Sequence, residues 1–225
     1  MQWRDHSKLK GKHALFSPSQ PGYLKLSEEE FKSRLVSKEK AGLGTEIHDW
    51  CFTRITRRHK ISSIKELVKS IDEFIFNKYY LPEYGIITLE GRRLLSALPY
   101  VGTETFSTIK SDVNDAISFR MDPEIVLLYS ERFFGTADSV AVTSDAIRIH
   151  DLKTGSTPAK IEQLLLYDAY LCHEYNIDPR SVELHELRIY QSDDILIGTP
   201  TGEDVMAVLE QLKRFDEIQR QFEEV

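Results

Sequence analysis

Two aspartates and a lysine lie on a predicted β-hairpin in the second half of this 225-residue chain. Asp138 precedes the turn expected at Ser144-Asp145, and Asp151 and Lys153 follow it. Asp138 and Asp151 are equally distant from that turn, so they are expected opposite each other on one face of the hairpin. Aliphatic residues fill the same face nearer the turn, which places the charged end at the edge of a hydrophobic core.

Two opposed carboxylates need a compensating partner. Directly opposed residues on neighbouring strands have Cβ atoms about 5 Å apart, and like charges at that distance are destabilising. The pair could share a proton, pair with Lys153, or bind a hard divalent cation. A cation would also give the lysine a role, because its ammonium would lie near a phosphate oxygen or a water on that cation. This arrangement is typical of phosphodiester hydrolysis, although Asp-x-Lys alone is a weak signal and Glu30-Phe-Lys32 has similar spacing on a predicted helix.

Three further motifs accompany Asp151-Leu-Lys153 in a fixed order. They are Gly44-Thr-Glu-Ile-His48 on a predicted helix, Gly135-Thr-Ala-Asp138 on the first hairpin strand, and Gln163-Leu-Leu-Leu-Tyr167 on the following helix. The ordered set resembles the PD-(D/E)xK nuclease superfamily, in the branch that contains the RecB nuclease domain, Cas4 and phage recombination exonucleases. Phe16-Ser-Pro-Ser19 is also similar to the start of phage members of this group.

The resemblance implies a Mg²⁺ or Mn²⁺ site. Its ligands would be His48, Asp138, Asp151 and the backbone carbonyl of Leu152. Glu131 resembles an acidic position of several members that reaches a second metal. Cas4 and related iron–sulfur nucleases need four cysteines, whereas this chain has two, so the resemblance is to the members without a cluster.

The resemblance also implies a reaction. Lys153 would position or activate the water that attacks phosphorus in line, and Gln163 and Tyr167 would contact DNA or orient the lysine. The expected activity is a metal-dependent deoxyribonuclease that leaves 5′-phosphates, with an exonuclease in recombination, repair or phage DNA processing as the first choice. Besides DNA, the resemblance points to a recombination or single-strand-annealing protein as a partner.

Rival interpretations stay open on the sequence. One is a sequence- or structure-specific endonuclease on the same fold. Another is a catalytically inactive DNA-binding or interaction subunit, against which the intact Asp138, Asp151 and Lys153 argue. A structural scaffold with an accidental motif match is the last alternative.

Charge is distributed unevenly along the chain. The net charge is −7, yet residues 1–60 hold 13 Lys and Arg against 7 Asp and Glu, or +6, which leaves −13 for the remainder. A basic face on an acidic body is one outcome of folding, and mixing of the charges is the other. Arg57, Arg58, Lys60 and Lys160 are candidate DNA phosphate contacts, and solvated helix ends are the alternative.

Hydrophobic periodicity predicts helices, then a small sheet, then a helix, a strand and a helix. The expected helices are 28–38, 45–60, one beginning at 63, 88–98, 103–121, 158–175 and 202–224, and the expected strands are 124–131, 134–142, 146–153 and 182–190. This order predicts a single mixed α/β (α+β) domain over residues 1–225, helical to 122, with the sheet over 123–190 and a closing helix over 201–225.

The composition excludes several classes of protein. With 41% hydrophobic and 29% charged residues, a globular chain is expected, and the longest apolar run, 125–129, is too short to cross a membrane. Residues 1–12 lack the apolar segment of a secretory signal. Cys51 and Cys172 alone cannot build a disulfide framework, so a reducing cytoplasm is expected, that of the host if the protein is phage-encoded.

Overall fold

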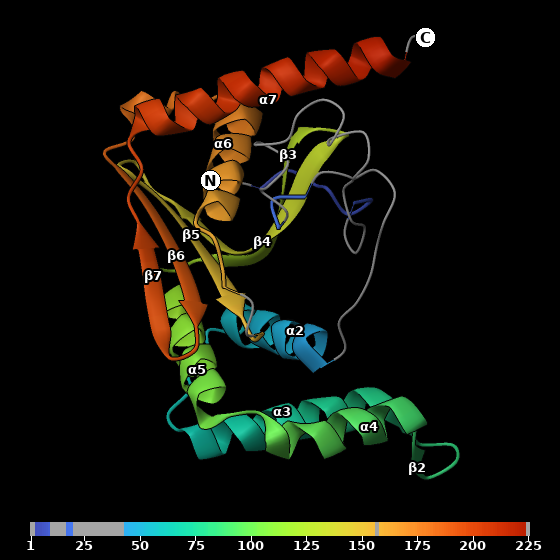
Figure 1. Ribbon diagram of the computed structural model, residues 1–225. Coiled ribbons are helices and arrows are strands. Elements are labelled where there is room, and N and C mark those ends of the chain that lie inside the picture. The colour runs from blue at the N-terminus through green and yellow to red at the C-terminus, as the bar shows by residue number, and fades with distance from the viewer. Residues whose placement is uncertain (1–2, 10–16, 20–42, 156–157, 224–225) are drawn as a thin grey trace.

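A five-stranded mixed sheet forms the centre of the molecule (Figure 1). The structure is a computed structural model that describes residues 3–9, 17–19, 43–155 and 158–223. The strands, in spatial order, are β3 (Asp122–Ser130), β4 (Phe133–Val142), β5 (Ala146–Lys153), β6 (Leu184–Gln191) and β7 (Asp194–Gly198). Only the β5–β6 pair is parallel among these. The mixed α/β fold predicted from the sequence is confirmed.

Helices cover both faces of the sheet. Those in the first half are α2 (Leu43–Thr56), α3 (Ile64–Tyr79), α4 (Leu89–Ala97) and α5 (Thr103–Ser118), and α6 (Glu162–Tyr175) and α7 (Gly202–Glu223) follow in the second half. The short elements are β1 (Tyr80–Leu81), β2 (Ile86–Ile87), η3 (Leu98–Tyr100) and η4 (Pro179–Ser181). Figure 1 shows α6 and α7 on one side of the sheet and α2 and α5 on the other, with α3 and α4 beyond them.

Period-two alternation in the hairpin strands feeds two hydrophobic cores. Val140, Ile147 and Ile149 point toward α6 and α7 and belong to the core on that side. Ala141 and Leu152 belong to the core formed with α2, α3 and α5. Burial of both faces fixes the register, because a shift of one residue would exchange the two sets.

The hairpin has the register expected from its turn. Ser139 pairs with His150, and the ladder continues to Val142 and Ile147, each pair equally distant from Ser144-Asp145. The ladder ends at Ser139 and His150, one pair before the two aspartates.

Several element ends differ from the sequence prediction. Helix α2 ends at Thr56 rather than at 60, and α5 ends at Ser118 rather than at 121. The chain turns there through left-handed residues, Arg58 at φ 55° and Arg120 at φ 57°. Helix α6 begins at Glu162 rather than at 158, and the sequence analysis missed β1, β2 and β7. The helix expected over 28–38 lies outside the described residues.

None of the helices that the structure describes combines the length and the apolar character needed to cross a membrane.

Candidate metal centre

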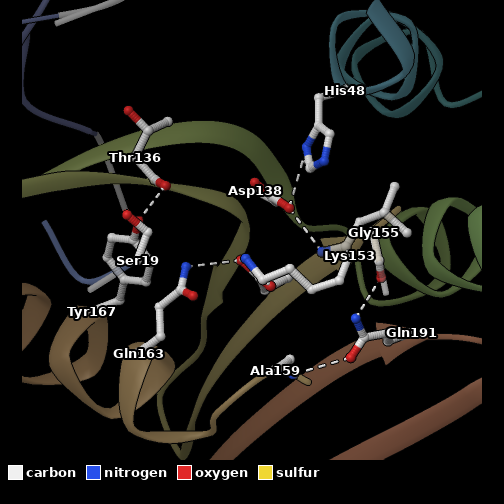
Figure 2. A network of polar contacts seen from close by, with 12 residues as sticks. Ser19, His48, Thr136, Asp138, Lys153, Gly155, Ala159, Gln163, Tyr167 and Gln191 are labelled. Atoms are coloured by element: carbon white, nitrogen blue, oxygen red, sulfur yellow. Dashed lines mark hydrogen bonds and ion pairs between the residues drawn. The ribbon is translucent and has the colours of Figure 1, made fainter. Parts of the chain in front are cut away.

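Asp138 lies where strands β4 and β5 separate. Its Oδ2 accepts the backbone N–H of Leu152 at 2.8 Å, so a side chain takes the place of the next ladder bond. Ala137 and Val140 both join the α6-side core although they are three positions apart, which shows that the alternation is interrupted at this point. The carboxylate therefore lies at the opening between the strands, facing α2 (Figure 2).

His48 on α2 faces this carboxylate. Its Nδ1 lies 3.4 Å from Asp138 Oδ2, and the two side chains are 28% and 20% exposed. Burial alone would lower the pKa of His48, but the neighbouring carboxylates, with Asp138 the largest contributor, raise that pKa to about 9. The imidazole thus carries a proton at neutral pH, which a metal ion would have to displace.

Helix α2 is held in place by contacts with α3 and by a close approach of its first turn to the end of β5. The buried Glu46 carboxylate accepts Lys78 Nζ at 2.7 and 3.0 Å and the Tyr79 hydroxyl at 2.9 Å, which ties α2 to α3. At Gly44 a Cβ atom would lie 3.1 Å from Thr154 Oγ1, just beyond the end of β5. The glycine of Gly44-x-x-x-His48 thus permits the close approach that brings His48 to the hairpin.

Glu124 on β3 completes a group that could hold a cation. Its neighbours Pro123 and Ile125 pair with Ser139 and Ala137, so Glu124 stands opposite Asp138, and its backbone is left-handed at φ 55°. One ligand atom from each of His48, Glu124 and Asp138 lies within 4.8 Å of the others. A histidine with two carboxylates fits a hard or borderline cation such as Mg²⁺ or Mn²⁺.

Asp151 has different partners from Asp138. Its Oδ1 accepts Lys153 Nζ at 2.9 Å and Gln163 Nε2 at 3.1 Å, and Lys153 Nζ also lies 2.8 Å from Oδ2. Burial and the charge of Asp138 raise the pKa of Asp151 to about 6, against the opposing effect of Lys153. The two aspartates therefore repel each other, but they do not form the ladder pair expected from the turn: Asp138 faces His48 on α2, whereas Asp151 is held by Gln163 on α6.

Helix α6 braces both strands. While Gln163 bonds Asp151 on β5, the Tyr167 hydroxyl donates to the carbonyl of Thr136 on β4 at 2.6 Å. Gln163 and Tyr167 are only 7% and 3% exposed, so in this geometry they orient the strands from within the fold and offer little surface to a ligand.

Steric crowding explains why the second motif has a glycine at position 135. A Cβ atom at Gly135 would lie 2.7 Å from Pro18 Cδ and 3.0 Å from the Tyr167 ring. The buried Pro18 of the N-terminal motif therefore packs on the hairpin beside the site, while Phe16 of that motif lies outside the described residues.

A small pocket lies at the cation group. The three candidate ligands line it together with Asp112, Ser139 and apolar residues such as Phe52 and Ile55. Burial and nearby carboxylates, with Asp138 first, raise the pKa of Asp112 well above its usual range. Among the described residues, the buried Asp112 Oδ1 has no hydrogen-bond partner. This concentration of carboxylates favours a cation in the adjoining group.

The remaining candidates lie apart from this group. Glu131 is exposed at the β3–β4 turn, and the structure brings Glu124 rather than Glu131 to the cation group. Arg58 donates to the Met121 carbonyl at 2.5 Å and Lys60 to Ser118 at 2.7 Å, so both fasten α2 to the end of α5. Arg57 and Lys160 are exposed.

Glu124 is the residue that the sequence analysis missed. A bulge between Leu128 and Ser130 shifts the β3–β4 register by one residue. Counting from the Glu131-Arg132 turn would therefore have paired Asp138 with Ile125 rather than with Glu124.

Comparison of the chain with models of known protein families finds no match, and a search of curated proteins finds none either. Any functional assignment therefore depends on the motifs and on the chemistry of the site.

Proposed function

We propose that this chain is a divalent-metal-dependent deoxyribonuclease that hydrolyses phosphodiester bonds. The observation that carries the proposal is one hairpin with two adjoining halves. On one half Asp138 meets His48 and Glu124 in a group that could hold a cation, and on the other Asp151 holds Lys153.

The residues divide the chemistry between them. His48, Glu124 and Asp138 would hold Mg²⁺ or Mn²⁺, and the Leu152 carbonyl and Asp151 stay predicted additional ligands. The bound cation would polarise a phosphate oxygen and lower the pKa of water.

Lys153 is placed to act on the phosphate. Its side chain is 30% exposed, and its ammonium keeps N–H donor capacity beyond the contact with the buried Asp151. It would orient the attacking water and stabilise the charge that develops on the phosphoryl oxygens.

Within this proposal we favour an exonuclease of DNA recombination, repair or phage DNA processing, with DNA and a recombination or single-strand-annealing protein as partners. Support comes from the motif order around the hairpin and from the basic composition of residues 1–60.

End-labelled linear DNA and covalently closed circles, each with Mg²⁺, Mn²⁺ or EDTA, test the proposal. We expect metal-dependent loss of the linear DNA, intact circles, and no cleavage in EDTA or with Asp138→Asn. Asp145→Asn, at the turn of the same hairpin, is the matched control and should cleave like the wild type. Cleavage of circles would replace the exonuclease by an endonuclease, and DNA binding without cleavage would indicate an inactive subunit.

A further inference from the structure

Gln191 bridges the loop that joins β5 to α6. It ends β6 and pairs directly with Lys153 in the parallel β5–β6 ladder. Its Nε2 donates to the carbonyl of Gly155 at 2.7 Å, and its Oε1 accepts the backbone N–H of Ala159 at 3.1 Å. Figure 2 shows both bonds, so a single side-chain amide holds the two limbs of the loop together.

The two limbs of this loop lead to the two side chains that donate hydrogen bonds to Asp151. Lys153 stands two residues before Gly155, and Gln163 stands four residues after Ala159. Both side chains converge on Oδ1 of Asp151, at 2.9 and 3.1 Å. The separation of the limbs therefore decides whether the ammonium and the amide reach the same oxygen.

We propose that Gln191 is a positioning residue for the Asp151–Lys153 pair, acting through the Gly155 and Ala159 backbone. The inference rests on the proposed nuclease function for its effect on the reaction. Its structural part, the convergence of Lys153 and Gln163 on Asp151, can be measured without any activity.

The test is Gln191→Leu, which removes both amide bonds and keeps a side chain of similar size. Two-dimensional NMR would follow water exchange of the Gln163 side-chain NH₂ protons, which we expect to accelerate about tenfold when the amide loses its fixed partner. We expect kcat on DNA to fall by about tenfold or more, as for small displacements of catalytic groups. The Kd for Mn²⁺ should change less than kcat does, since His48, Glu124 and Asp138 keep their places even where Asp151 is an additional ligand.

Two further variants separate positioning from general destabilisation. Gln191→Glu retains the acceptor for Ala159 and loses the donor to Gly155, so its effects should be intermediate. Thr108→Val removes the 2.7 Å bond from the Asp193 N–H, two residues beyond Gln191, and should leave Gln163 exchange and kcat unchanged.

The inference is overturned if Gln163 exchange is unchanged in Gln191→Leu, or accelerates equally in Thr108→Val. It is also overturned if exchange accelerates in an active enzyme while kcat stays at the wild-type value. Failure of the proposed function looks different: the wild type would not cleave DNA, and the exchange measurement would still decide whether Gln191 positions the pair.

Discussion

The two strands of the hairpin present their carboxylates in opposite ways. On β4, the Asp138 side chain is 20% exposed and meets His48 from α2 and Glu124 from β3. On β5, the Asp151 side chain is 4% exposed and is held by Lys153 and Gln163. We call the first the open half, because its carboxylate is the more exposed although the Leu152 N–H and His48 already contact it, and the second the buried half.

The backbone explains this difference. The β4–β5 ladder stops at Ser139 and His150, and Glu124 on the neighbouring strand is left-handed, so the sheet is irregular on both sides of Asp138. Asp151 remains within the β5–β6 ladder, where it pairs with Ile189. Irregular backbone at functional groups is a common way to aim side chains at a ligand.

The comparison predicts that loss of Asp138 has the largest effect. Asp138→Asn keeps the shape of the side chain and removes the charge that faces His48. We expect the affinity for Mn²⁺, measured by isothermal titration calorimetry, to fall by at least about a hundredfold, with loss of DNA cleavage. Asp145→Asn controls for charge, and wild-type affinity in Asp138→Asn would place the cation elsewhere.

Removal of the Lys153 ammonium should affect catalysis and metal binding differently. Lys153→Met should lower kcat by about a hundredfold, because a charge near the reacting phosphate is lost. The Mn²⁺ affinity should not fall, since His48, Glu124 and Asp138 keep their places and the lost ammonium is a positive charge near Asp138. An equal loss of Mn²⁺ binding in Lys153→Met and Asp138→Asn would show that the halves are not distinct.

A comparison of two glutamates tests which of them is a metal ligand in the open half. Glu124→Gln should weaken Mn²⁺ binding about tenfold to a hundredfold, as expected for the loss of a charged ligand. Glu131→Gln is the matched control, because this exposed residue at the β3–β4 turn lies outside the cation group. Weakening by Glu131→Gln alone would reverse the assignment.

A smaller effect concerns pH. Because the pKa of His48 is raised to about 9, binding of a cation between pH 6.5 and 8.5 should release one proton. The affinity should therefore rise with pH, by up to about tenfold per unit, and level off near pH 9. Titration in buffers of different ionisation enthalpy measures the release, which His48→Gln should abolish; release unchanged in that variant would contradict the assignment.

The sequence predicted those features that depend on local patterns. The Ser144-Asp145 turn and the alternating aliphatic residues on either side were sufficient for the hairpin register, because both faces are buried. The structure adds a reason for the motif glycines, because a side chain would meet Thr154 at Gly44, and Pro18 and Tyr167 at Gly135.

Other features depend on long-range partners or unusual backbone and could not be predicted in this way. A left-handed glutamate has no sequence signature, and Glu124 joins the site only through β3–β4 pairing. The bond from the Arg58 guanidinium to the Met121 carbonyl, 63 positions away, also has no local signal, and the phosphate contact predicted for Arg58 stays a prediction. Strands as short as β1 and β2 carry too few residues to show a period.

The location of a bound cation tests the central claim most directly. Crystals grown with Mn²⁺, measured at a wavelength where manganese scatters anomalously, would show each ion as a peak. We predict a peak coordinated by His48, Glu124 and Asp138. A peak held by Asp151 without His48 and Glu124, or no peak at the hairpin at saturating Mn²⁺, would contradict it.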